Sequence, residues 1–277
     1  MDEAFPPFEP HENDMPKSQK LKRIPMRFII PNLITVLAIC AGLTGIRLAF
    51  ESRFELAVSA VLFAAFLDGV DGRIARMMKG SSKFGEQMDS LADIVNFGVA
   101  PALVLYAFVL DQARSIGWIA ALLYCIACCL RLARFNVMLE TPNRPVWQNN
   151  YFVGVPAPAG AMAVLLPVYL GFLGMAPGRT TAFVFAAYTV VIAILMVSRL
   201  PVYSGKYGGR WVQRDMVIPL ILCVVLYAAF LMSFTWETLT LTTIAFLASL
   251  PLSARSWNRL AAANETTAPG AKDSESQ

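Results

Sequence analysis

Several apolar runs are long enough to cross a lipid bilayer, and they limit the possible folds more than any other feature. The runs "FIIPNLITVLAICAGLTGI", "IGWIAALLYCIACCL" and "MVIPLILCVVLYAAFLMSF" each approach the roughly 20 apolar residues that a helix needs to cross about 30 Å of hydrocarbon. Of the 277 residues, 57% are hydrophobic and 15% charged, which leaves too little polar surface for a soluble domain. The chain is therefore predicted to be an integral membrane protein.

The spans are expected to be helices, because lipid offers the backbone no hydrogen-bond partners and a helix pairs its own N–H and C=O groups. We predict an all-α fold, a polytopic membrane helix bundle with about eight transmembrane helices. The expected centres of the spans are Ala38, Ala64, Val99, Leu123, Leu165, Val191, Val224 and Ile244.

The loops between these spans differ in charge when they are assigned alternately to the two sides of the membrane. One side collects the basic residues of segments 17–27, 73–83, 131–144, 199–214 and 255–272. The other side receives only Arg47, Arg53, Arg114 and Arg179. Cytoplasmic loops carry the excess of Lys and Arg, so both termini are expected in the cytoplasm.

The two ends of the chain and its cysteines offer little chemistry. Residues 1–27 form a polar tail without the apolar core of a signal peptide, and residues 254–277 have the composition of a disordered tail. All five cysteines fall inside predicted spans, where they most simply pack as small apolar residues. The only histidine, His11, lies in the tail, which argues against a histidine base or a histidine-bound metal.

The segment Leu67 to Asp93 places four aspartates beside this apolar chain. Asp68 and Asp71 are separated by three residues and Asp89 and Asp93 by four, so each pair shares one side of a helix. An ionised Asp at bilayer depth costs on the order of 3 kcal/mol, and such residues are by default functional candidates. Joined by the turn-forming "KGSSKFG", the two pairs can converge as an antiparallel hairpin.

Four carboxylates that close together need a counter-charge. Two divalent cations would supply it, and hard oxygen ligands favour Mg²⁺ or Mn²⁺. A pair of such ions can hold the attacking and leaving oxygens of a displacement at phosphorus. The alternative is a solvated charged helix face, in which Asp68, Asp71, Arg73, Arg76, Lys79 and Lys83 pair with one another.

The spacing D-x2-D-G-x2-A-R-x8-G-x3-D-x3-D runs through this segment without a gap. It is matched by Asp68, Asp71, Gly72, Ala75, Arg76, Gly85, Asp89 and Asp93. In these residues the chain resembles the CDP-alcohol phosphotransferase family. The resemblance implies a six-helix catalytic core, expected over residues 28–210, with two additional helices at 211–253, and transfer of a substituted phosphoryl group from a CDP-linked donor to an alcohol.

The resemblance also implies roles for individual residues. Asp68, Asp71, Asp89 and Asp93 would bind two divalent cations, and Asp93 would also be the base for the incoming hydroxyl. The CDP part would contact Pro31, Asn32, Thr35, Gly72, Arg76 and Ser82. For "PNLIT" the alternative is ordinary, since Pro and Asn are good first-turn residues.

Three further segments, "DSLADIVNFGVAPA", "LRLARFN" and "YFVGVPAPAGA", are similar to the bacterial membrane-embedded phosphatidylserine synthases of this family. Asn96 departs from that pattern, in which Ser is more frequent. The similarity implies CDP-diacylglycerol and L-serine as substrates, a bacterial inner membrane, a cytoplasmic active site and a homodimer, with no nucleic-acid partner.

L-Serine carries a carboxylate that needs a cation. Arg131 and Arg134, three residues apart at the cytoplasmic end of the fourth span, are candidates, and Asn136 could add an amide. Their alternative role is that of membrane-surface anchors.

Other functions remain open at this stage. Within the family, the acceptor could be glycerol 3-phosphate, giving phosphatidylglycerophosphate, or inositol phosphate. From another class, intramembrane carboxylates also occur in cation and proton transporters. Transport sites usually lie near the bilayer midplane between related repeats, whereas these aspartates gather in one hairpin without a second copy.

Overall fold

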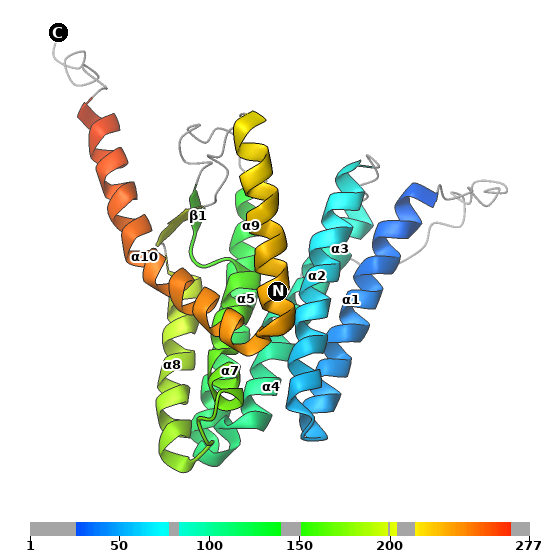
Figure 1. Ribbon diagram of the computed structural model, residues 1–277, viewed down its shortest axis with the longest axis vertical. Helices are drawn as coiled ribbons and strands as arrows, with labels where there is room; N and C mark the ends of the chain where they lie inside the picture. Colours follow the sequence, from blue (N-terminus) through cyan, green and yellow to red (C-terminus); the bar gives the residue numbers. More distant parts are fainter. Residues whose placement is uncertain (1–25, 78–82, 140–150, 199, 204–213, 267–277) are drawn as a thin grey trace, which may run out of the picture.

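The protein is a bundle of helices, seen here in a computed structural model that describes residues 26–77, 83–139, 151–198, 200–203 and 214–266 (Figure 1). The elements in chain order are α1 (Met26–Phe50), α2 (Phe54–Met77), α3 (Lys83–Asp93), the π-helix η1 (Ile94–Val99), α4 (Ala100–Phe108), the 3-10 helix η2 (Leu110–Ala113), α5 (Ser115–Leu139), β1 (Tyr151–Val153), α6 (Ala157–Val164), α7 (Leu166–Phe172), α8 (Arg179–Val197), β2 (Pro201–Tyr203), α9 (Arg214–Ser233) and α10 (Thr235–Thr266).

The predicted all-α membrane bundle is confirmed. Within the described residues, five helical spans are long and apolar enough to cross a membrane: Ile29–Phe50, Phe84–Phe108, Ser115–Met138, Arg179–Val197 and Met216–Ser233. The second of these is one rod made of α3, η1 and α4. A small antiparallel ribbon, in which β1 pairs with β2, is the only strand structure among the described residues.

The other three predicted spans are helical but less regular. The helix α2 carries the charged motif in its second half. The segment Ala157–Phe172 is short and divides at Leu165 into α6 and α7. The helix α10 continues to Thr266, so part of the predicted tail 254–277 is helical here, as the helix-forming "RLAAAN" allows.

Two tyrosines compensate for prolines within the bundle. Pro101 and Pro167 lack the N–H that would bond the carbonyl four residues earlier, at Phe97 and Ala163. The Tyr124 hydroxyl donates to the Phe97 carbonyl oxygen at 2.8 Å, and the Tyr188 hydroxyl to the Ala163 oxygen at 2.7 Å. Each hydroxyl comes from a neighbouring long helix, α5 or α8. The proline breaks therefore also join helices.

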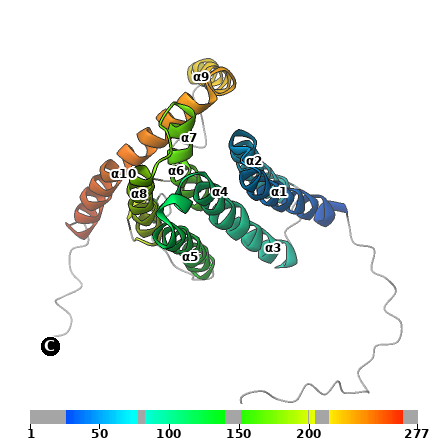
Figure 2. The ribbon, with the colours of Figure 1, turned by 90° about the horizontal axis from the view of Figure 1, so that it is seen from below.

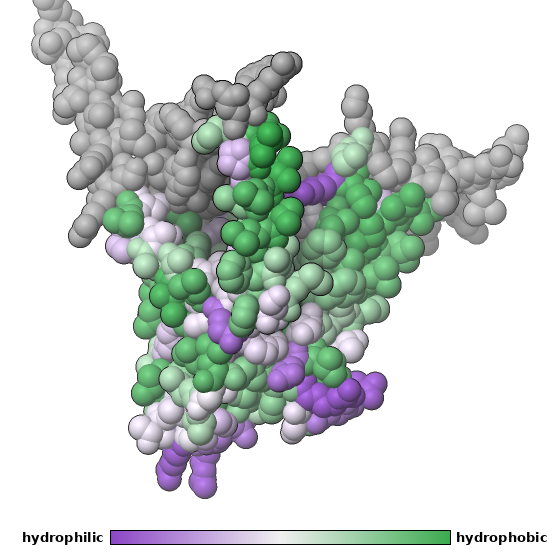
Figure 3. All heavy atoms as spheres, in the orientation of Figure 1, coloured by the Kyte–Doolittle hydropathy of each residue, from purple (hydrophilic) through white to green (hydrophobic). Residues whose placement is uncertain are grey.

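The helices are arranged unequally around the core. In Figure 2, α1 and α2 lie side by side along one flank, while α5 and α8 pack on the far side of α4. The membrane-spanning part of α9 buries none of its side chains and lies at the outer edge, beside α10. Figure 3 shows hydrophobic residues covering the flank formed by α1, α2 and α9, with hydrophilic residues gathered where α1 turns into α2. This apolar flank suits a lipid environment.

The two tyrosine contacts yield a stability prediction. Tyr124→Phe and Tyr188→Phe should each lower the melting temperature in detergent, because a buried acceptor left without a donor costs about 1–3 kcal/mol. Tyr106→Phe is the matched control, since among the described residues its hydroxyl has no hydrogen-bond partner. Equal melting temperatures for all three variants would contradict the proposed role of the hydroxyls.

Candidate active site

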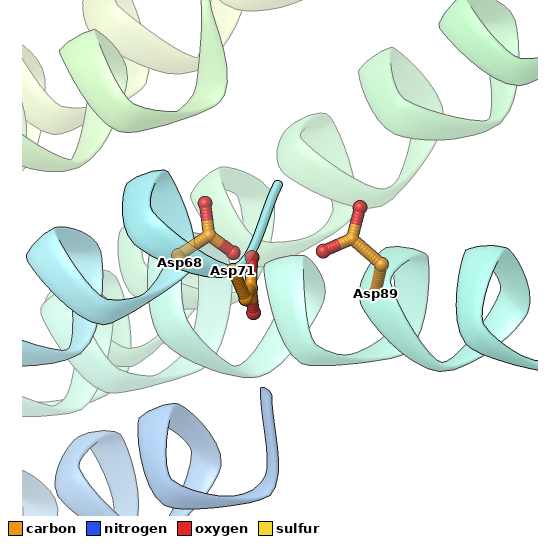
Figure 4. Close-up of side chains that lie close together, drawn as sticks. All are labelled: Asp68, Asp71 and Asp89. Atoms are coloured by element: carbon orange, nitrogen blue, oxygen red, sulfur yellow. The ribbon is translucent and has the colours of Figure 1, made fainter. Parts of the chain in front are cut away.

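Four aspartates from two helices meet in one small volume. The helix α2 supplies Asp68 and Asp71, and α3 supplies Asp89 and, at its last residue, Asp93. One carboxylate oxygen from each of Asp68, Asp71 and Asp89 lies within 4.8 Å of the other two. Figure 4 shows the first two carboxylates on α2 facing Asp89 across a short gap. The two carboxylates of α2 thus face that of Asp89 on α3, as the predicted hairpin requires.

Asp93 extends this cluster by one helical turn. Its carboxyl is in hydrogen-bonding contact with that of Asp68 and close enough to interact with the charges of Asp71 and Asp89. Carboxylates so close repel one another when all are ionised. The arrangement is therefore stable only with protons or cations among the acids.

The free oxygen atoms of the cluster fit a hard cation. Asp68 Oδ1 and Asp71 Oδ1 are buried, and neither has a hydrogen-bond partner among the described residues. A buried acceptor without a partner is costly, and a metal ion would relieve that cost. Since every donor is a carboxylate oxygen, the set suits Mg²⁺ or Mn²⁺. Asp68, Asp71 and Asp89 could hold such an ion.

The first helix contacts the cluster through one residue of "PNLIT". The Thr35 hydroxyl donates to Asp71 Oδ2 at 2.8 Å and lies 3.1 Å from the carbonyl oxygen of Pro31. Asn32 is half-buried on the same helix. A sequence reading could have found the Thr35 contact only by pairing α1 with α2, which are 36 residues apart at this point.

Two of the other predicted nucleotide contacts, Gly72 and Arg76, belong to the last part of α2. A Cβ atom added at Gly72 would meet no described atom within 4 Å, so a ligand has room beside it. Arg76 belongs to α2, but its side chain lies outside the described part, as does Ser82 altogether.

The predicted serine-binding residues serve different neighbours. Arg131 is only 9% exposed, lies close enough to Asp93 to interact with its charge, and its Nε has no partner among the described residues. The Arg134 Nη1 instead donates to the Val197 carbonyl oxygen at 2.8 Å, at the end of α8. The Asn136 Nδ2 donates to Ser90 Oγ at 3.0 Å. Although they lie three residues apart on α5, the two arginines have different neighbours, Asp93 for Arg131 and the end of α8 for Arg134.

Asn96 is a buried polar residue to which the sequence assigned no role. It lies in η1, one turn beyond Asp93, and is fully buried. Neither its Nδ2 nor its Oδ1 has a partner among the described residues, and its side chain packs directly against Gly42 of α1. A glycine is needed there because a Cβ would overlap the amide oxygen.

Comparison with known proteins identifies relatives over most of the chain. The family model described as CDP-alcohol phosphatidyltransferase matches residues 28–197, and that of CDP-alcohol phosphatidyltransferase 2 matches residues 215–251.

Three relatives carry the name CDP-diacylglycerol–serine O-phosphatidyltransferase. The Mycobacterium leprae protein is 46% identical over 173 residues, which cover 62% of this chain and only 57% of that relative. The Mycobacterium bovis protein is 38% identical over 84% of this chain and 80% of its own length. The Helicobacter pylori protein is 35% identical over 70% of this chain and 79% of its own. The chain belongs to the CDP-alcohol phosphatidyltransferase family, because the family model matches more than half of the chain and these relatives are similar over most of it.

Proposed function

We propose that this protein transfers the phosphatidyl group of CDP-diacylglycerol to the hydroxyl of L-serine, giving phosphatidylserine and CMP, by two-metal catalysis. The convergence of Asp68, Asp71 and Asp89 within 4.8 Å, with Asp93 beside them, is the observation that carries the chemistry. The choice of serine is supported by the names of the three relatives.

The four aspartates would hold two ions, Mg²⁺ or Mn²⁺, which when bound neutralise the donor pyrophosphate and the charge that develops at phosphorus. Asp93 accepts the proton of the serine hydroxyl. The serine oxygen then forms a bond to the phosphorus that bears diacylglycerol, and the bond from that phosphorus to CMP breaks. CMP leaves with its negative charge, which Arg76 binds through its guanidinium.

The remaining residues bind and orient the substrates. Pro31, Asn32, Gly72, Arg76 and Ser82 would contact the nucleotide of the donor. Arg131 binds the serine carboxylate, because it is the buried guanidinium next to the proposed base. Arg134 and Asn136 support this site from α5 through their bonds to Val197 and Ser90.

The charge distribution supports an orientation for the reaction. The excess of basic residues on one set of loops supports a cytoplasmic side for the active site and both termini. The bacterial relatives support a bacterial inner membrane as the location. The lipid donor enters from the inner leaflet with its acyl chains still in the bilayer, and serine approaches from the cytosol. Small residues such as those of "AICAGLTG" would allow two copies to pack closely as a homodimer.

Glycerol 3-phosphate is a weaker candidate as acceptor. Its phosphate would require a denser basic pocket than a serine carboxylate, and the three relatives are named for serine. Family membership likewise removes the reason to propose a cation transporter.

Acceptor choice can be measured directly. Membranes containing the protein, given CDP-diacylglycerol and Mn²⁺, should release CMP when L-serine is added and should incorporate labelled serine into lipid. Parallel reactions with glycerol 3-phosphate and inositol phosphate are the comparison. CMP release with either of these and none with serine would reject the proposed acceptor.

The proposed base can be tested with Asp93→Asn. The substitution should reduce turnover at least about 100-fold, the lower range for general base catalysis, while CDP-diacylglycerol still binds. Asp111→Asn, an exposed aspartate in η2 far along the chain from the motif, is the control and should keep native turnover. Native activity of the Asp93→Asn enzyme would rule out its role as the base.

The division of labour between the two arginines predicts different defects. Arg131→Gln should raise the KM for serine about tenfold or more, since a hydrogen bond to a charged group contributes about 1.5–3 kcal/mol. Arg134→Gln should instead lower the melting temperature, because it removes the bond to the end of α8. A serine KM that changes only in the Arg134 variant would reverse the assignment.

A further inference from the structure

Thr35 is the residue outside the acidic motif with the shortest described bond to it. Its side chain is 4% exposed and that of Asp71 is 2% exposed, so their 2.8 Å hydrogen bond is shielded from water. The bond joins α1 to α2 across 36 residues of sequence. The contact is thus a tertiary one that the fold builds within the apolar bundle.

The Thr35 hydroxyl has one proton and two acceptors within reach. The Pro31 carbonyl oxygen, at 3.1 Å, lies four residues back along α1, so it can also accept the helical backbone bond. Asp71 Oδ2 is closer, at 2.8 Å, and a carboxylate is the stronger acceptor. The proton therefore goes to the carboxylate.

Thr44, nine residues further along α1, shows the alternative. Its hydroxyl donates to the Cys40 carbonyl oxygen at 2.6 Å, which is the usual bond of a threonine to the preceding turn of its own helix. Thr35 differs in being buried and in having a carboxylate beside it, whereas Thr44 is exposed.

The bond makes the two carboxylate oxygens of Asp71 different. Oδ2 accepts from Thr35, whereas Oδ1 is buried and has no partner among the described residues. With one oxygen occupied, the other is presented to the acidic cluster in a single orientation.

We propose that Thr35 is a positioning residue for the metal site. Its hydroxyl holds the Asp71 carboxylate so that Oδ1 faces the cation, and Thr35 does not itself bind the nucleotide. This inference rests on the metal site of the proposed function. Partners that orient metal ligands in this way typically change metal affinity by about 10- to 100-fold when they are removed.

The test is Mn²⁺ binding to the purified full-length protein in detergent, measured by electron paramagnetic resonance without either substrate. Thr35→Val keeps the shape but removes the hydroxyl, and should weaken Mn²⁺ binding about 10- to 100-fold. Thr35→Ser restores a hydroxyl and should bind close to the native level. Thr44→Val, the same change on the same helix, should leave Mn²⁺ binding and activity unaltered.

A double variant examines the route of the effect. In an Asp71→Asn background, Thr35→Val should cause no further loss of Mn²⁺ affinity, because the two residues act through one contact. Thr35→Ala, measured in parallel, removes the same hydroxyl should the valine variant not fold.

Native Mn²⁺ affinity in folded Thr35→Val or Thr35→Ala protein would overturn the inference. If these variants raised only the KM for CDP-diacylglycerol and left Mn²⁺ affinity native, Thr35 would instead be a nucleotide contact. Because serine is absent from the measurement, a wrong acceptor assignment would not affect the result. A native protein that binds no Mn²⁺ would refute the two-metal proposal itself, and this inference with it.

Discussion

Repulsion among four carboxylates at the junction of α2 and α3 is the constraint around which the rest of the bundle is organised. In water such charges would separate, but the first half of α2 packs in the apolar core and α3 is held against α1. The helix α1 packs against both and directs the Thr35 hydroxyl into the cluster. The fold thus keeps the acids from moving apart, which is the arrangement that the proposed metal site needs.

The same apolar surroundings explain why the carbonyl groups that face two of the prolines are paired with tyrosine hydroxyls. A backbone carbonyl that loses its helical donor to a proline cannot bond water at this depth, so another helix must supply a donor. Tyr124 and Tyr188 do this for Phe97 and Ala163, and both bonds tie a broken segment to a long helix. The breaks at η1 and Leu165 therefore shape the interior without weakening it.

Asn96 has a buried amide with no partner at either polar atom among the described residues. It lies in the π-helical turn that directly follows Asp93, and such turns often occur at functional sites. The wider turn alters which residues of the rod share a face with the acids. A strict α-helical spacing could not have anticipated this.

Much of the architecture could be predicted from composition and spacing. Runs of apolar residues must become helices in lipid, and the spacing of Asp68 and Asp71, and of Asp89 and Asp93, puts each pair on one helix side. Both arguments need only local geometry, which the order of residues dictates. The motif shared with the family also lies within one short segment, Asp68 to Asp93, so it could be found without the tertiary structure.

Tertiary packing decided which side chains meet. Arg131 and Arg134 carry the same charge and lie three residues apart on α5, yet Arg131 interacts with Asp93 and Arg134 bonds the end of α8. Thr35 and Thr44 lie on one helix, and only the first finds a carboxylate. These outcomes depend on how α1, α5 and α8 are rotated and packed against their neighbours. The packing of all the helices together determines those rotations. No local pattern encodes them, because the segments that meet are far apart in the chain.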